Sequence, residues 1–313
     1  MARVTVFPNG VTASFPRRGK GPEEPVKRGK VQGWSVQSTR RLRRWFYSVD
    51  GDQLTGQGVA VTLTVRDLPP TAADWTRTHR AFLMRLRRAG LVRGQWLTEW
   101  QRRGVPHLHG AFFFPGNCEA PAETVLEHWL AAAADWSPAA SGQHVTPLWG
   151  LSGWLQYQAK HSVRGVKHYQ RAKVPAAWRE GTGRLWGVVG EWPTREEVVE
   201  VSSASYHRFR RLMRSWLIAE ARRSAAAARD PEKAAAELRR AAWLRGLLRD
   251  PEKARSRVRA VGEFCPEHVA RQLLAVAELR TPLGNLTKSA STPCSTQPGR
   301  GPGRRVRSLK HRV

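Results

Sequence analysis

The stretch Pro106-His107-Leu108-His109-Gly110-Ala111-Phe112-Phe113-Phe114 places two histidines directly before a run of apolar residues. Side chains two positions apart point the same way in an extended strand. His107 and His109 are therefore predicted to share one face, while Leu108 and Phe112 face a core. Imidazole is the commonest metal-binding side chain, so this face is a candidate metal site. The alternative is a strand that carries two surface histidines.

A second strand is predicted over 95–101, just before a turn that contains Arg102 and Arg103. If the polar faces of the two strands coincide, the Glu99 carboxylate joins the two imidazoles, with Gln101 as a further oxygen ligand. Two nitrogen ligands and one oxygen ligand leave open positions. Such a site suits Mn²⁺ or Mg²⁺ acting on a phosphodiester better than a closed zinc site. The alternative is an exposed Glu99 paired with Arg102 or Arg103.

A third candidate element is the segment Tyr157-Gln158-Ala159-Lys160-His161. On a helix, Tyr157 shares a face with Lys160 and His161. A phenol becomes a useful nucleophile where a cation stabilises the phenolate and a metal polarises the phosphate under attack. Lys160 is then expected to balance charge on the phosphorus. The alternative is a buried helical tyrosine covered by a lysine stem.

The chain is strongly basic, since 53 Lys+Arg against 25 Asp+Glu over 313 residues give a formal net charge of +28. Nucleic acid is the default partner for such a chain, and an anionic membrane is the competing one. No apolar run is long enough for a transmembrane helix and no signal-peptide core follows the first residues, so we expect a cytoplasmic protein without a membrane partner. Three widely spaced cysteines predict neither a disulfide framework nor a zinc finger.

The rest of the pattern predicts a mixture of helices and strands. Strands are expected over 59–65 and 183–190, and helices over 35–49, 71–90, 124–136, 153–164 and much of the chain beyond 202. Asp-Pro pairs at 230–231 and 250–251 are typical helix starts. Three other histidines lack ligand spacing and are expected to be structural or at the surface: His128, His144 and His168. Four tryptophans are expected to fill the core, with stacking on unpaired bases as the alternative: Trp149, Trp154, Trp178 and Trp186.

These motifs, in this order, resemble the HUH endonucleases, specifically the rolling-circle replication initiators of bacterial plasmids and filamentous-type phages. The similarity runs from about Gly33 to Pro193 and rests on the segments 33–42, 59–65, 99–109, 157–161 and 183–187. The resemblance implies an α+β fold, with an antiparallel sheet flanked by helices as in ferredoxin-like nuclease domains. The histidine strand is then expected to be central, and a basic helical region to follow the nuclease domain.

The resemblance also implies roles for individual residues. His107, His109 and Glu99 become ligands of Mn²⁺ or Mg²⁺, Tyr157 the nucleophile and Lys160 its helper on the phosphate. In such enzymes the tyrosine nicks one strand at a specific origin site. This leaves a 5′-phosphotyrosine and a free 3′-OH that primes synthesis, and the enzyme later transfers the strand.

The chain departs from the family pattern after the motif lysine. His161 stands where many relatives have an aromatic residue, and we expect a solvated histidine there, with a ligand or positioning role as the alternative. Tyr169 follows Tyr157 by twelve residues, past Gly165, so the two would not share one helix face. We therefore predict single-tyrosine chemistry with Tyr169 in reserve. An activated water or a second subunit would perform the second cleavage.

Four regions are predicted along the chain: a poorly ordered basic arm over 1–33, the endonuclease domain over 34–195, a basic helical region over 202–280 and a disordered basic tail over 281–313. The expected partners are origin DNA, single-stranded or cruciform, together with a host helicase and polymerase. Eight basic residues are candidates for DNA contacts: Arg40, Arg41, Arg43, Arg44, Arg102, Arg103, Arg164 and Lys167.

Other functions remain open on the sequence alone. The same chemistry would serve an HUH transposase or a relaxase in conjugative transfer. A non-catalytic DNA-binding regulator with the same fold is a second alternative, although it would not need Glu99, both histidines, Tyr157 and Lys160 together. A basic RNA-binding or chromatin-like protein would explain the charge and nothing else.

Overall fold

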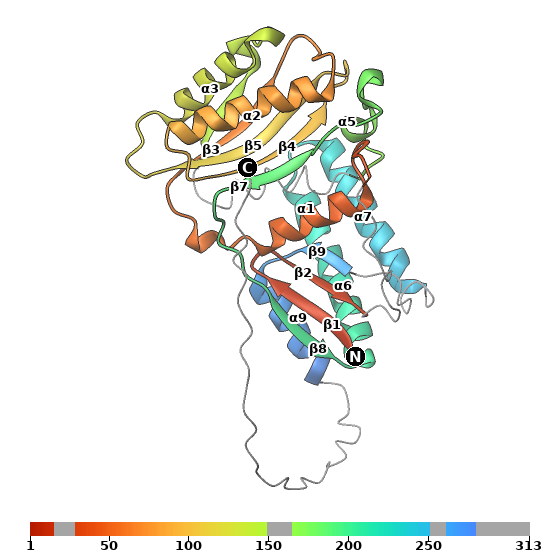
Figure 1. The fold of residues 1–313 in the computed structure, drawn as a ribbon. Helices are drawn as coiled ribbons and strands as arrows, with labels where there is room; N and C mark the ends of the chain where they lie inside the picture. Colours follow the sequence, from red (N-terminus) through yellow and green to blue (C-terminus); the bar gives the residue numbers. More distant parts are fainter. Residues whose placement is uncertain (16–28, 149–164, 251–260, 280–313) are drawn as a thin grey trace, which may run out of the picture.

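The computed structural model describes residues 1–15, 29–148, 165–250 and 261–279, which form two antiparallel sheets with helices packed against them (Figure 1). The larger sheet has five strands in the order β6-β3-β5-β4-β7. Its strands are β3 (Gln57–Thr64), β4 (Arg93–Trp100), β5 (Pro106–Phe114), β6 (His144–Leu148) and β7 (Trp186–Val189). The α+β prediction is confirmed, and the histidine strand β5 is the middle strand.

The α-helices of the described residues are α1 (Val36–Ser48), α2 (Ala72–Arg88), α3 (Pro121–Ala132), α5 (Tyr169–Ala172), α6 (Ser203–Ala227), α7 (Pro231–Arg249) and α9 (Glu267–Leu279). Two of the predicted helices begin one residue after their expected starts, at Val36 and Ala72. The helix predicted over 124–136 begins earlier, at Pro121, and the short helix over 169–172 was not predicted. Asp230 caps α7 by accepting a hydrogen bond from the Glu232 backbone, as predicted. The helix predicted over 153–164 lies outside the described residues. Among the helices that are described, none has the length and apolar character needed to cross a membrane.

One face of the five-stranded sheet is covered by α2 and α3 (Figure 1). Helix α2 begins with a capping box between Thr71 and Asp74, which satisfies backbone N–H groups of its first turn. Phe82 of α2 packs edge-on against Phe112 of β5 and Trp129 of α3, with ring centroids 5.5 and 5.4 Å apart. These large aromatic contacts form the apolar core on this side of the sheet.

The other face of the sheet lies toward α1 (Figure 1). Leu42 and Phe46 of α1 are buried in the same core as the sheet residues. Trp186 of β7 donates from Nε1 to the Ser38 hydroxyl of α1 over 3.0 Å. Because strand side chains alternate, the residues between the core-facing positions of β3, β4 and β5 point toward this second face.

The smaller sheet has four strands in the order β8-β1-β2-β9. They are β1 (Ala2–Phe7), β2 (Gly10–Ser14), β8 (Glu197–Val201) and β9 (Val261–Phe264). Helices α6 and α9 pack on this sheet, and its core includes Val4, Val11, Phe209, Met213 and Leu274. The predicted helical region over 202–280 is therefore part of a mixed unit that also contains strands.

The prediction of a poorly ordered arm over 1–33 is wrong for residues 2–14, which form a buried β-hairpin. Val4, Val6 and Val11 are at most 2% exposed. The basic, Gly- and Pro-rich composition that suggested an arm belongs to 16–28, which lies outside the described residues, as does the predicted tail over 281–313. The prediction was based on the composition of residues 1–33 as a whole, which overlooked the short alternating strands at their start.

Arg195 connects the parts of the chain that carry the two sheets. It donates from Nε to Asp50 Oδ2 over 3.1 Å and from its two terminal nitrogens to the Glu267 carboxylate over 2.9 and 2.8 Å. Hydrogen bonds from Arg195, and a further contribution from Arg271, lower the pKa of Glu267 to about 2. Glu267 begins α9, so this contact ties the smaller sheet to the loop after α1.

We expect Arg195→Ala to lower the free energy of unfolding at pH 7 by about 1 kcal/mol, because both ion pairs are partly exposed to solvent. The pKa of Glu267 is depressed in the folded state, so its contribution is present above its ordinary value of 4.5 and is lost as the pH falls toward 2. Urea unfolding at pH 7, 4 and 3 should therefore show the difference between wild type and variant shrinking with pH. A difference that is constant across this range would contradict the assignment.

Candidate metal centre

Glu99, His107 and His109 come together on two adjacent strands. Glu99 of β4 lies directly opposite His107 of β5, and His109 lies opposite Leu97. Their side chains are 0, 6 and 4% exposed, and one ligand atom from each lies within 4.8 Å of the other two. The predicted convergence of one carboxylate and two imidazoles is therefore present in the fold.

The distances within this cluster suit a single bound cation. His107 Nε2 and His109 Nε2 are 3.1 Å apart, and His109 Nε2 is 3.8 Å from Glu99 Oε2. Ligand atoms about 2.1 Å from one ion and at right angles to each other would lie roughly 3 Å apart. The Thr62 hydroxyl is 2.9 Å from His109 Nδ1 and orients the ring so that Nε2 faces the cluster.

Arg171 is the main site residue that the sequence did not reveal. Its Nε donates to Glu99 Oε1 over 2.9 Å, and both side chains are completely buried. The Arg171 guanidinium also lies 4.1 Å from the centre of the Trp34 ring and donates to the Thr39 hydroxyl over 3.4 Å. Arg171 thus holds one oxygen of Glu99 and leaves the other directed at His109. No local sequence signal marks an arginine 72 residues away as this partner.

The alternative in which Glu99 is exposed and pairs with the hairpin arginines is wrong. Arg103 instead donates to the backbone carbonyls of Val65 and Arg66 and to Gln101 Oε1. Gln101 in turn donates to the Thr64 hydroxyl over 2.9 Å. With its carbonyl oxygen used by Arg103, Gln101 lies beside the cluster and supports the hairpin. As a metal ligand it remains only a prediction.

The short helix α5 lies at the edge of the cluster. It carries Gln170, which is 8% exposed, and Arg171 on the inside. Tyr169 lies on the outside, 38% exposed, with the Arg102 guanidinium 5.6 Å from the centre of its ring. His168 caps the helix through its ring nitrogen, which accepts a hydrogen bond from the Gln170 backbone. The structure therefore places Tyr169 on the element that lines the metal cluster, beside the β4–β5 turn.

Four residues of the predicted site lie outside the described residues: Tyr157, Lys160, His161 and Arg164. Their roles remain predictions.

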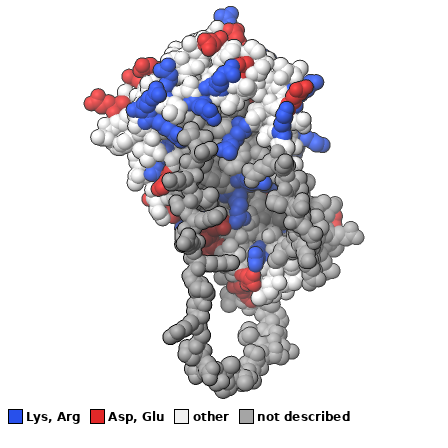
Figure 2. Space-filling view, in the orientation of Figure 1, with Lys and Arg blue, Asp and Glu red and all other residues white. Residues whose placement is uncertain are grey.

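Some of the residues predicted to contact DNA are exposed, and others contact neighbouring residues of the protein. Arg40, Arg41, Arg102 and Lys167 are exposed. Arg44 pairs with Glu196 over 2.8 Å, and Arg43 is half-buried near Tyr47. Figure 2 shows Lys and Arg side chains spread over the upper part of one face of the molecule, rather than gathered in one patch.

Of the residues expected to be structural or at the surface, Trp178 and Trp186 belong to the core packing and His128 and His144 lie partly or fully at the surface. Trp178 is 1% exposed within the core, and Trp186 is half-buried between β7 and α1. His144 is exposed and bonded to Thr146, and His128 is half-buried on α3. Trp149 and Trp154 lie outside the described residues.

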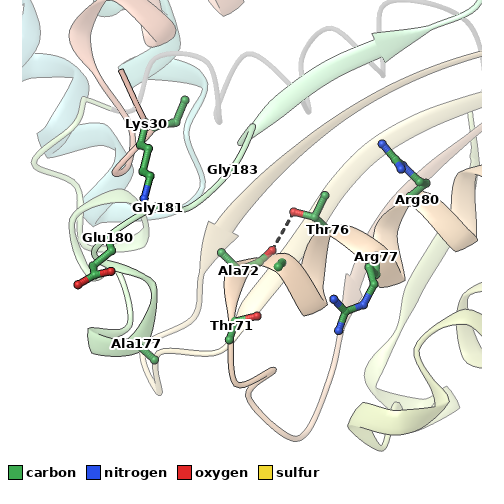
Figure 3. A pocket seen from close by; sticks show the side chains of 12 residues that line it. Lys30, Thr71, Ala72, Thr76, Arg77, Arg80, Ala177, Glu180, Gly181 and Gly183 are labelled. Carbon is green, nitrogen blue, oxygen red and sulfur yellow. Dashed lines mark hydrogen bonds between the residues drawn. The ribbon is translucent and has the colours of Figure 1, made fainter. Parts of the chain in front are cut away.

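A separate hollow of about 660 Å³ lies between the start of α2 and the loop over 177–183 (Figure 3). Lys30, Arg77 and Arg80 contribute positive charge to its walls, and Glu180 contributes a negative one. Small residues, among them alanines and glycines, make up much of the rest of the lining. It contains none of the metal-cluster residues, so the candidate chemistry is not located there.

Three replication proteins are similar to this chain over most of its length. One, named a replication protein of Xylella fastidiosa strain 9a5c, is 43% identical over 240 residues, which cover 72% of this chain and 82% of the relative. A second, from Xylella fastidiosa strain Temecula1, is 42% identical over 240 residues, covering 72% and 88%. A replication-associated protein of Pseudomonas phage Pf3 is 41% identical over 252 residues, covering 79% and 86%. No family model matches the chain, and no solved structure matches it.

The buried ion pair between Glu99 and Arg171 predicts a strongly non-additive effect on stability. Arg171→Leu should lower the free energy of unfolding by roughly 3–5 kcal/mol, because it leaves a buried carboxylate without its counter-ion. Adding Glu99→Gln to that variant should recover a large part of this destabilisation. Urea unfolding of the two single variants and the double variant measures this coupling. Additive effects would show that the two side chains do not depend on each other.

Proposed function

This chain belongs to the family of the Xylella and Pf3 replication proteins, and from that membership we propose that it initiates DNA replication by nicking one strand at an origin. The observation that carries the proposal is the buried cluster of Glu99, His107 and His109. Burying a carboxylate beside two imidazoles costs free energy. A protein that only bound DNA would have no use for that arrangement, so the cluster favours an enzyme over a regulator.

The donor set of the cluster fits Mn²⁺ or Mg²⁺. Glu99 Oε2 and the Nε2 atoms of His107 and His109 would hold the ion, with Thr62 and Arg171 keeping two of these ligands in place. When bound, the ion would polarise a phosphate oxygen of the DNA and stabilise the negative charge that develops there.

Tyr157 is the proposed nucleophile. Its Oη attacks the scissile phosphorus and gives up its proton, and the bond from phosphorus to the 3′ oxygen breaks. The 3′ oxygen leaves as a hydroxyl after taking up a proton, and the 5′ phosphate stays on the tyrosine. One P–O bond forms and one breaks, so the strand can later be rejoined without another energy source. Lys160 would balance charge on the phosphate. Tyr169 is the reserve nucleophile. His161 is expected to be solvated, with a ligand or positioning role as the alternative.

The proposed partner is origin DNA in single-stranded or cruciform form. A free 3′-OH primes synthesis, so a host polymerase and a helicase would follow the nick. Exposed arginines on α1 and on the β4–β5 turn are suited to phosphate contacts, because each neutralised phosphate releases condensed counterions.

Tyr157→Phe is expected to abolish the covalent protein–DNA adduct while DNA affinity stays within about twofold, because the substitution removes only the attacking oxygen. The measurement uses labelled single-stranded oligonucleotides that tile the origin of the replicon encoding this chain, Mn²⁺ and denaturing gels. Chelation of Mn²⁺ should also abolish the adduct in wild type. An adduct formed by the variant at the wild-type rate would refute Tyr157 as the nucleophile and direct attention to Tyr169.

The double variant Arg40→Ala/Arg41→Ala should weaken binding of single-stranded DNA and reduce the steepness of its salt dependence by roughly 0.7 for each phosphate that is no longer neutralised. Fluorescence anisotropy between 50 and 300 mM salt gives this slope. Arg87→Ala/Arg88→Ala is the matched control, since it removes two exposed arginines from α2 on the opposite face of the sheet. Equal changes in the two double variants would mean that α1 makes no specific DNA contact.

A further inference from the structure

Gln170 is a buried amide beside the metal cluster, and the nicking chemistry proposed for the cluster assigns it no role. It belongs to α5, is 8% exposed, and its Nε2 lies 3.5 Å from His107 Nε2. His107 Nε2 is the atom that faces His109. Gln170 therefore approaches the cluster at the point where its imidazole nitrogens converge.

The other end of the same amide is unsatisfied. Gln170 Oε1 is buried and has no hydrogen-bond partner among the residues that the structure describes. A buried carbonyl oxygen without a partner costs about 1–3 kcal/mol. A half-turn of the amide exchanges oxygen and nitrogen with almost no change in shape. That rotation would place Oε1 next to His107 Nε2.

Metal binding makes this rotation favourable. A cation on His107 Nε2 uses the lone pair that would otherwise accept a hydrogen bond from the Gln170 amide nitrogen. The amide N–H₂ would then face a metal-bound nitrogen that cannot accept from it. With the amide turned, the buried carbonyl oxygen gains the cation as a partner, and the N–H₂ group no longer faces the metal-bound nitrogen.

We propose that Gln170 Oε1 is a fourth protein ligand, which completes a site of two nitrogens and two oxygens with Glu99, His107 and His109. The 3.5 Å separation from His107 Nε2 falls between the 3.1 and 3.8 Å separations within the cluster. An amide oxygen is a neutral, hard ligand of the kind that Mn²⁺ and Mg²⁺ accept. The inference rests on the proposed function, because it concerns the same metal site.

The position of Gln170 is fixed by its neighbours. Arg171, the next residue, is bonded to Glu99 Oε1, and His168 bonds the Gln170 backbone N–H. The ligand and the residue that anchors Glu99 are therefore consecutive on one short helix. These supporting contacts fix the backbone position of Gln170, so that only its side-chain amide has to turn when the ion binds.

The test counts the water molecules on bound Mn²⁺ in the full chain by pulsed EPR in ¹⁷O-enriched water. Gln170→Leu should add one bound water, because it opens a coordination position, and should weaken Mn²⁺ binding by roughly tenfold or more. Gln170→Glu supplies an oxygen at the same place, so the water count should equal that of wild type and the affinity should be retained or rise.

Gln95→Leu is the matched control. Gln95 is completely buried on β4, and neither of its amide atoms has a hydrogen-bond partner among the described residues. It points to the same face of the sheet as Glu99 but lies four positions away, about 13 Å along the strand. Its removal should leave the water count and the Mn²⁺ affinity unchanged.

The outcomes separate this inference from the proposed function. An unchanged water count in Gln170→Leu, or an extra water in Gln170→Glu, overturns Gln170 as a ligand and leaves the three-residue site intact. If wild type binds no Mn²⁺ at millimolar concentrations, the metal site itself fails, and the proposed function fails with it.

Discussion

The pairing register of β4 against β5 is the constraint on which the candidate site depends. Glu99 faces His107 only in this register, and a slip of one residue would turn the carboxylate into the aromatic core under α2. The turn between the strands sets the register. Gly104 adopts a φ of +83°, which other residues rarely adopt, and the Gln101 backbone N–H donates to the Val105 carbonyl over 2.9 Å. Close packing of the strands adds to this, since a Cβ on Gly110 would lie 2.7 Å from the Gln95 carbonyl oxygen.

The hairpin supplies the ligands, but other segments hold them in place. Arg171 neutralises the buried carboxylate and lies against Trp34, while Trp34 donates from Nε1 to the Thr98 carbonyl over 3.0 Å. A buried ion pair adds little to net stability compared with apolar packing, because both ions lose their hydration. The presence of this ion pair next to two imidazoles therefore indicates that it serves to orient the Glu99 carboxylate rather than to stabilise the fold. One oxygen of Glu99 is fixed so that the other has a defined direction.

The sequence predicted the parts of the structure that depend on local pattern. Alternation over 106–114 identified β5 and the face that carries His107 and His109. The helical pattern over 71–90 identified α2, and the Asp-Pro pair at 230–231 identified the start of α7. The contact between Arg171 and Glu99 could not be predicted, because it joins residues far apart in the chain through tertiary packing. The first hairpin, residues 2–14, was missed because its strands are short and a long basic segment follows it. Gln170 carried no signal, since a single glutamine has no spacing pattern.

The smaller sheet joins the two ends of the described chain. Its central strands β1 and β2 come from the first 14 residues, and their outer partners β8 and β9 come from 197–201 and 261–264. Within the part of the chain that the structure describes, the strands of the larger sheet all lie between residues 57 and 189. During synthesis on the ribosome, the described strands of the larger sheet are therefore made before β8 and β9, the two strands that pair with the first hairpin. A chain that ends before residue 197 would expose the edges of both β1 and β2, and one that ends between β8 and β9 would expose the edge of β2. Exposed strand edges make such truncated products targets for chaperones and proteases.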